Sequence, residues 1–483
     1  MSAFRTTFST LFPTAQRPFL AYGLLVLLSV LAAVLWYQPL FLALPVLPLL
    51  VLQTLIGYKK IFYLLIACIP ISVEVNFSAS LGTDIPFEPL VIGLMLAYIA
   101  NLLTNFRGKW SLQVVGHPLI LLLLLHFGWS LAATIGSESQ VLSIKWMLAK
   151  FWYIITFVFV AIECLRETRD YKWLYWSLVP LLVATVLYTL VRQALNGFAF
   201  DAVNDALHPF YRNHVNYAAT LAIALPFLWY GRQWFSRRIA AQAVWLAIVV
   251  IVFLGVQFAY TRAAYVSLLL AVAAYWVVRW RLMRLALLSV SIVATIGVGW
   301  LIYDNNFLKI APQYEKTVTQ DNFNDLVTAT AQGKDISTME RVNRWVAGGR
   351  MVAIHPGMGF GPSTFYTFYK KYLLARFRTY VSVNDEKSTV HCYFLLMLIE
   401  QGIPGFLLFI ALVFGILLHG ERIYHQTTDP TRRRIVLAAL LSEVVIIGFL
   451  LINDMLETDK VGSFFFLNIA ILVNMDMLNR RKV

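Results

Sequence analysis

Long apolar runs, separated by short polar stretches, repeat along nearly all of the 483-residue chain. A helix that crosses a bilayer needs about 20 consecutive, mostly apolar residues. Runs of that length, repeated along the chain, predict an all-α polytopic membrane protein with about 12–14 transmembrane helices. The number of helices stays open because the third candidate is short and contains Pro70. The candidate segments are residues 19–36, 39–57, 61–75, 86–103, 117–135, 146–165, 173–193, 214–231, 240–258, 262–278, 283–303, 403–419, 435–452 and 461–478.

The apolar pattern has one long break, over residues 304–390, where the chain becomes polar and aromatic. A connection of that length within a helical bundle usually carries function. We therefore expect an N-terminal bundle of about eleven spans over residues 1–303 and a large loop with short helices over 304–390. Residues 391–483 would add three spans to the same bundle.

Composition agrees with the membrane class, because 60% of the residues are hydrophobic and 13% are charged, against about 25% charged in soluble domains. The net charge of +14 comes largely from basic residues in alternate loops, a pattern that concerns topology rather than nucleic-acid binding. It predicts that both termini are cytoplasmic and that the loop 304–390 is extracytoplasmic. The basic loops are residues 5–17, 59–60, 107–109, 166–172, 232–238, 279–284, 422–434 and 480–482.

Charged side chains near the membrane are candidate functional groups, since a charge at membrane depth is costly. Arg262 lies in a very short turn between two apolar segments, where its guanidinium can bind a phosphate through paired hydrogen bonds. Arg212 and His214 belong to a dense polar stretch at the start of another span, and Lys150 lies about one turn inside a span. The structural alternatives are a side chain extended to the interface and a helix cap.

Inside the long loop, residues 337–340 have a capping-box pattern that predicts the start of a helix, and His355-Pro356 predicts its end. Such a helix places Arg341, Arg344 and Trp345 on one face. The glycine-rich stretch 357–361 follows, and we expect a tight turn there that lets backbone approach a ligand closely.

His391 stands at the end of the loop, where a histidine can titrate near neutral pH and serve as a general base. Activity that depends on it should fall below about pH 6, near the reference pKa of histidine. The structural alternative is a capping or interfacial histidine. Two glycines and a proline within residues 400–405 predict a broken helix at the membrane surface. The three cysteines contain no C-x-x-C pair, so we expect neither a disulfide nor a metal site.

Taken in order and spacing, these stretches resemble the O-antigen ligase and polymerase superfamily of bacterial envelope glycosyltransferases, whose fold is GT-C-like. The residues that carry the resemblance are 211–216, 260–264, 341–361, His391 and 400–405. Two positions depart from the family pattern: Cys392 stands where Asn is frequent, and Thr261 and Ala263 flank an arginine that Ser and Gly often flank.

The resemblance implies an enzyme of the bacterial inner membrane that transfers a glycan from undecaprenyl-diphosphate to an acceptor hydroxyl at the outer face, with inversion and without a metal or other cofactor. It implies that His391 takes the proton of the acceptor and that Arg262 stabilises the leaving diphosphate. The other diphosphate-binding candidates are Arg212, Arg341, Arg344, Lys150 and His214.

Three functional hypotheses stay open at this point. The first is an O-antigen ligase-like transferase with lipid A-core as acceptor, alongside a polysaccharide polymerase or a protein O-oligosaccharyltransferase of the same superfamily. The second is a transporter, which should show paired broken helices and charges near the midplane, whereas here the polar residues gather at one membrane surface. The third is an assembly protein without catalysis, in which alanine replaces Arg262 and His391 without effect.

Overall fold

The structure is a computed structural model, and helices dominate the part of the chain that it describes. This confirms the prediction of an all-α polytopic membrane protein. Residues 312–334 of the predicted long loop lie outside the described residues, as do the basic residues Arg5, Arg107 and Lys109. The described ranges are 16–35, 46–78, 81–104, 112–235, 238–311, 335–379, 381–382 and 388–480.

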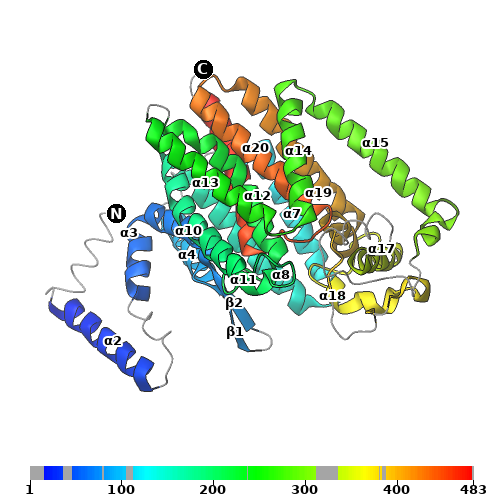
Figure 1. Cartoon of the computed structure of the whole chain (residues 1–483). Helices are drawn as coiled ribbons and strands as arrows, with labels where there is room; N and C mark the ends of the chain where they lie inside the picture. Colours follow the sequence, from blue (N-terminus) through cyan, green and yellow to red (C-terminus); the bar gives the residue numbers. More distant parts are fainter. Residues whose placement is uncertain are drawn as a thin grey trace.

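The helical elements follow one another in two groups, divided by the long loop (Figure 1). Before it come α2 (Gln16–Leu35), α3 (Val46–Cys68), α4 (Phe87–Thr104), α6 (Leu112–Val115), α7 (Pro118–Ile135), α8 (Gln140–Ile154), the π-helical segment η3 (Ile155–Val160), α9 (Ala161–Cys164), α10 (Thr168–Leu195), α11 (Val203–Leu207), α12 (His214–Gly231), α13 (Ile239–Gln257), α14 (Arg262–Arg279), α15 (Met283–Ile302) and η5 (Tyr303–Ile310). The loop contains α17 (Ile336–Ile354), α18 (Phe365–Phe368), η7 (Tyr369–Tyr372) and η8 (Ala375–Phe377), and after it come α19 (Tyr393–Gln426), α20 (Pro430–Leu450) and α21 (Asp459–Arg480).

Nine helical segments of the described chain are long and apolar enough to cross a membrane. Outside the long loop, four more described helices, α2, α3, α12 and α20, have 18 to 23 residues but fall outside that count. The predicted spans 39–57 and 61–75 meet in the single helix α3, which bends at Gly57, where the backbone leaves helical geometry. The predicted break at residues 400–405 is confirmed, because Gly402 interrupts α19 with a φ of 67°.

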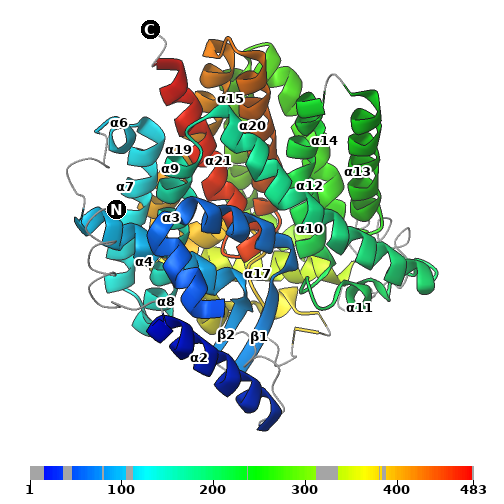
Figure 2. The same cartoon turned by 90° about the vertical axis from the view of Figure 1, so that its left-hand side faces the viewer.

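The core of the bundle forms around α21, whose spanning window is 89% buried, more than that of any other candidate span. It packs against α20, α19, α12 and η3, and Figure 2 shows it among these helices near the centre of the bundle. A helix that is apolar all round belongs in such an interior position. Around it, α20 packs against α12 and α14, and α7 packs against α19.

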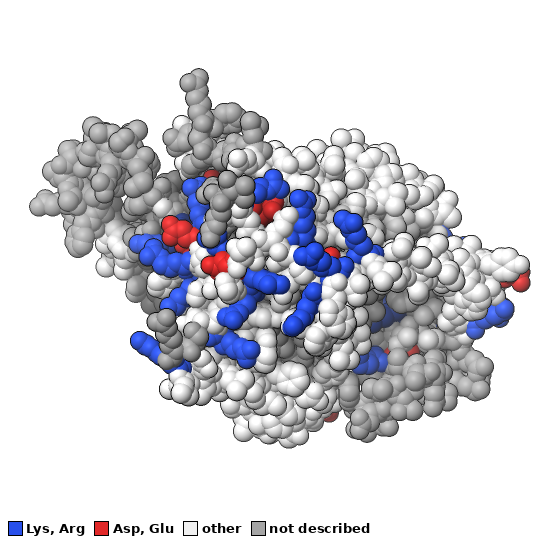
Figure 3. All heavy atoms as spheres, turned by 90° about the horizontal axis from the view of Figure 1, so that it is seen from above, with Lys and Arg blue, Asp and Glu red and all other residues white. Residues whose placement is uncertain are grey.

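The two ends of the bundle differ in charge. The C-terminus and the start of α15 lie at the top of Figure 1, and α17, α18 and the β-hairpin lie at the bottom. Seen from above, the top end carries a gathering of Lys and Arg side chains (Figure 3). We call the top end the basic face and the opposite end, which carries α17 and the hairpin, the loop face.

One element of the fold was not predicted. The stretch between α3 and α4 forms an antiparallel hairpin of β1 (Val73–Ser78) and β2 (Leu81–Ile85), with Val73 paired to Ile85. Its short strands extend from the loop face (Figure 1), and an open sheet edge is tolerated only outside the hydrocarbon of a bilayer.

The loop helix α17 begins and ends close to the predicted positions, but its cap is different. Asp335, rather than Ser337, is the N-cap residue, and its side chain accepts a hydrogen bond from the backbone N–H of Thr338. Glu340, predicted to close a capping box, instead accepts hydrogen bonds from Thr379 and Ser382. The prediction of a capping box was therefore wrong, because a stronger acceptor precedes it by two residues.

Candidate functional site

Arg262 connects the membrane bundle to the loop helix. It is the first residue of α14, and its Nη2 lies 3.4 Å from Oδ2 of Asp335, the residue that caps α17. The side chain of Asp335 is buried, whereas that of Arg262 is 30% exposed. The guanidinium is thus fixed at one edge and accessible from the loop face, which is the arrangement a phosphate-binding arginine requires.

Arg341 and Arg344 lie on the first turns of α17, close to this ion pair. Arg344 forms an i,i+4 salt bridge with Glu340 at 3.4 Å. Arg341 is largely buried, and burial together with the positive charges of Arg262 and Arg344 lowers its pKa from the ordinary arginine value. The structure therefore brings three predicted arginines together and leaves an excess of positive charge between α14 and α17.

His391 completes this cluster two residues before α19 begins. Its backbone has a φ of 52°, its Nε2 lies 3.2 Å from Oγ of Ser388, and the indole N–H of Trp345 donates to the carbonyl of Val390 at 2.9 Å. Burial, with the positive charges of Arg341 and Arg344, lowers the pKa of His391 to about 3. The expectation that it titrates near pH 6 was wrong for the unliganded site, because three influences that the sequence does not show disfavour its protonated form.

Asp454 is a member of the site that the sequence reasoning missed. It follows α20, and its Oδ1 accepts a hydrogen bond from Oγ1 of Thr389 at 2.9 Å, two residues before His391. Burial raises the pKa of Asp454 to about 6, although Thr389 and the nearby Arg341 and Arg344 favour its charged form. A signal was available, because the short segment between the last two predicted spans contains three carboxylates on the same side as the long loop.

Lys150 lies behind the site rather than in it. Its Nζ forms a salt bridge of 2.7 Å with Glu457, and the hydroxyl of Tyr393 donates to the same carboxylate at 2.6 Å. Only 4% of the Lys150 side chain is exposed. Lys150, predicted from the sequence to bind the diphosphate, thus belongs to a buried ion pair. Together with the Tyr393 hydroxyl, this ion pair joins α8 to the start of α19.

Arg212 and His214 lie on the neighbouring edge of the loop face. Arg212 contacts the hairpin carboxylates Glu74 and Asp84 at 2.9 and 3.5 Å, and the His214 ring lies 3.1 Å from Asn204. The backbone carbonyl of His214 accepts a hydrogen bond from Thr261 at 3.3 Å, so the starts of α12 and α14 adjoin. None of the contacts described for Arg212 or His214 reaches His391 or the arginines of α17.

The glycine-rich turn 357–361 approaches the chain's own backbone, not an open ligand pocket. The N–H groups of Phe360 and Gly361 donate to the carbonyls of Ile399 and Glu400 at 3.0 and 2.8 Å. In return, the N–H of Ile403 donates to Pro356 at 2.8 Å. The tight turn was predicted with a ligand as its partner, whereas the partner that the structure shows is the break in α19.

Glu400 holds the same contact from the helix side. Its buried carboxylate accepts hydrogen bonds from the backbone N–H groups of Ser363 and Phe365, at 2.7 and 2.9 Å. A Cβ on Gly402 would lie 2.2 Å from the carbonyl oxygen of Gly357. The Glu-x-Gly pattern of residues 400–402 therefore attaches the loop to the bundle, and it positions α17 beside His391.

The arrangement has a definite chemical character. Three guanidinium groups, a neutral imidazole and the carboxylates of Asp335 and Asp454 meet at the loop face. Within the described residues, no three His, Cys, Asp or Glu side chains are grouped as metal ligands. Such a site can bind a strongly anionic group beside a base that is unprotonated at neutral pH.

Two comparisons with known proteins bear on this site. No curated protein matches the chain. Residues 246–410 match the family model described as O-antigen ligase, and this range contains Arg262, Asp335, Arg341, Arg344 and His391. The resemblance drawn from the motifs is thereby confirmed over this range: residues 246–410 are similar to the O-antigen ligase family.

Proposed function

We propose that this protein transfers a glycan from undecaprenyl-diphosphate to an acceptor hydroxyl, at the outer face of the bacterial inner membrane, with lipid A-core as the acceptor. The observation that carries the proposal is a cluster in which Arg341 and Arg344 act on the neutral ring of His391 and Arg262 lies close to Arg341. A diphosphate is the leaving group that such a cluster fits best, because guanidinium groups bind phosphate oxygens bidentately. The match to the O-antigen ligase family supports the reaction class.

In the proposed reaction, the acceptor oxygen attacks the anomeric carbon as the bond from that carbon to the diphosphate oxygen breaks. His391 takes the proton of the acceptor hydroxyl, and the electron pair of the broken bond stays on the diphosphate. Attack from the side opposite the leaving group inverts the anomeric centre. The leaving group is already activated, so orientation, charge stabilisation and one base suffice.

Binding of the donor would change the ion pairs of the site. Diphosphate oxygens compete with Asp335 for Arg262, whose guanidinium is accessible from the loop face. The negative charge of the diphosphate also offsets Arg341 and Arg344, whose positive charge helps to hold the pKa of His391 down. We therefore expect the donor to raise the pKa of His391 and so to strengthen the base when the substrate is bound.

The decisive experiment uses purified full-length protein in liposomes with an undecaprenyl-diphosphate oligosaccharide, with and without lipid A-core. We expect a single shifted product on a gel only when lipid A-core is present. A ladder without added acceptor would instead show a polymerase, and activity only on a protein acceptor would show a protein O-oligosaccharyltransferase. An untouched donor under all these conditions would contradict the proposal.

Alanine variants test the residues in the same assay. Arg262→Ala and His391→Ala should each lower transfer by about a hundredfold or more, the usual scale for loss of a charge-stabilising donor or a general base. Lys371→Ala is the control, because Lys371 is exposed on the loop and lies outside the cluster. Full activity in both site variants, at unchanged protein level, would overturn the proposed roles of Arg262 and His391.

A further inference from the structure

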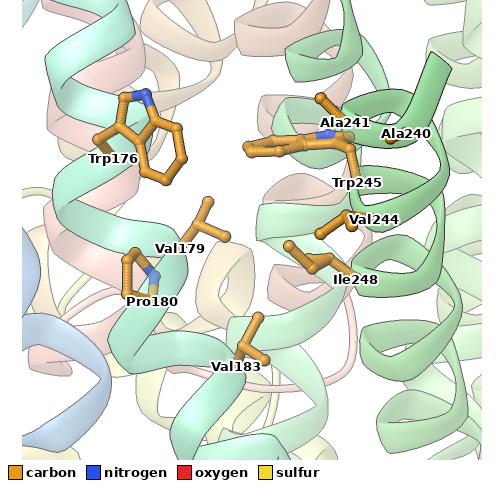
Figure 4. Close-up of a pocket in the computed structure, with 9 residues that line it drawn as sticks. All are labelled: Trp176, Val179, Pro180, Val183, Ala240, Ala241, Val244, Trp245 and Ile248. Carbon is orange, nitrogen blue, oxygen red and sulfur yellow. The ribbon is translucent and has the colours of Figure 1, made fainter. Parts of the chain in front are cut away.

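A second feature of the molecule lies far from this site. A groove of about 500 Å³ opens between α10 and α13, and Figure 4 shows two tryptophans, Trp176 and Trp245, facing each other across it. The lining side chains are apolar throughout, and all come from these two helices. They are Trp176, Val179, Pro180, Val183, Ala240, Ala241, Val244, Trp245 and Ile248.

The groove is built into the two helices. Ala240 and Ala241 leave space on the α13 side, and Pro180 interrupts the hydrogen-bond ladder of α10 on the other. Trp245 forms a rigid wall, because it is 4% exposed and its indole N–H donates to the carbonyl of Leu228 at 2.6 Å. Gly231 permits this position, since a Cβ there would lie 2.5 Å from the Trp245 ring.

The position of the groove in the bundle follows from the two helices. α10 and α13 both begin at the basic face; Ala240 belongs to the first turn of α13, and Trp176 lies about two turns into α10. From Trp176 to Val183 the groove extends about 10 Å along the helix axis. In a bilayer it is therefore filled by hydrocarbon from the leaflet at the basic face, which is the leaflet away from the Arg262 cluster.

The mouth of the groove is basic. Arg169 and Lys172 precede Trp176 by seven and four residues, so they lie on the same face of α10, about 6–10 Å nearer the basic face. Arg238 caps the start of α13 on the other side. All three are exposed, and within the described residues none forms a salt bridge.

The acidic residues nearby are occupied elsewhere. Asp170 pairs with Lys59 at 2.6 Å, and Glu167 belongs to the capping box of α10. The contrast with the loop face is clear, because Arg212, Arg262 and Arg344 each have a carboxylate partner there. No carboxylate of the described chain thus forms a salt bridge with the basic mouth, and a phosphate would supply such a partner.

We propose that the groove binds one acyl chain of an anionic phospholipid, with the lipid phosphate held by Arg169, Lys172 and Arg238. The spacing fits this class of ligand, because a glycerol backbone separates the phosphate of a phospholipid from its acyl chains. Basic side chains at the membrane surface attract anionic lipid, and an apolar groove continuous with them selects a lipid over a soluble anion. The proposal does not depend on the glycosyltransferase activity.

The test measures lipid binding to purified full-length protein by native mass spectrometry, during titration with phosphatidylglycerol or phosphatidylcholine. Ala241→Phe fills the groove, and Ala247→Phe is the matched control on the same helix, exposed but outside the lining. We expect Ala241→Phe to weaken phosphatidylglycerol binding by about tenfold or more and Ala247→Phe to leave it unchanged. Equal binding by the two variants would overturn the proposal.

A second variant keeps the test informative if Ala241→Phe fails to fold. The double variant Arg169→Gln with Lys172→Gln should lose the preference for phosphatidylglycerol while keeping its binding of phosphatidylcholine. An unchanged preference would refute the role of the basic mouth. Competition with undecaprenyl phosphate is the third arm, and displacement of phosphatidylglycerol by an equimolar amount of that carrier would assign the groove to the carrier instead.

Discussion

Burial moves the pKa values of His391 and Asp454 in opposite directions, since it disfavours the charged form of each. The histidine, at about 3, is neutral throughout the physiological range. The carboxyl, at about 6, loses its charge as the pH falls through that value. Both groups flank Arg341 and Arg344, so the charge of Asp454 influences how strongly His391 can bind a proton.

This difference makes a pH prediction that separates the two residues. In the proposed transfer, kcat/KM should fall as the pH drops below about 6, because Asp454 becomes neutral and no longer balances the arginines beside His391. Asp454→Asn should lower activity and remove that pH dependence, whereas Thr389→Val should lower activity and keep it. The measurement is kcat/KM in proteoliposomes from about pH 4.5 to 8. An acid limb that persists unchanged in Asp454→Asn would assign it to another group.

At the scale of elements, the decisive contact joins the glycine-rich turn to the break in α19. Gly402 adopts a φ of 67°, and Gly359 and Gly361 have φ values of 70° and 100°. Residues with a side chain rarely adopt such a backbone conformation, and a Cβ at these positions would also clash with neighbouring atoms. The loop helix is thus positioned by backbone hydrogen bonds that only glycine permits.

The substitution Gly402→Ala should break the contact between the glycine-rich turn and α19. The substitution costs roughly 1–3 kcal/mol for the backbone conformation alone, and the new Cβ would lie 2.2 Å from the Gly357 carbonyl oxygen. We expect faster protease cleavage within residues 304–390 and a loss of transfer of about tenfold. Gly349→Ala is the control, since it lies in α17 with open space around it, and it should leave both readouts unchanged. Similar protease sensitivity in the two variants would argue against the contact.

At the scale of the whole molecule, charge distinguishes the two ends of the bundle. Lys and Arg side chains gather at the basic face, as Figure 3 shows, whereas Arg212 and Arg262 of the loop face are paired with carboxylates. From the positive-inside pattern we propose that the basic face is cytoplasmic, and the proposed reaction would then take place outside.

Orientation can be tested by labelling introduced cysteines in intact cells. In a Cys392→Ser background, Lys371→Cys on the loop face should react with a membrane-impermeant maleimide, and Arg422→Cys on the basic face should react only after permeabilisation. Both positions are exposed, and the two remaining cysteines, Cys68 and Cys164, are buried. The reverse pattern would place the site in the cytoplasm and contradict the proposed use of an externally presented donor.

The sequence by itself determined the membrane class, the long loop, the break at Gly402 and most of the residues that meet at the site. These features depend on the local composition and spacing of residues. They can be predicted from hydrophobicity, from helix periodicity and from the conformations that glycine allows. Arg262, Arg341, Arg344 and His391 could be proposed together because their motifs occur in a recognisable order.

Only the tertiary structure decided which charges pair. It placed Lys150 against Glu457, Arg212 against the hairpin, and Asp454 beside Thr389. It also showed that the pKa of His391 is low, because burial and two arginines from another helix act on it. Contacts between residues tens to hundreds of positions apart leave no periodic trace in a single sequence, and electrostatic effects depend on distance in space. For that reason the site's residues were predictable, and their partners and protonation states were not.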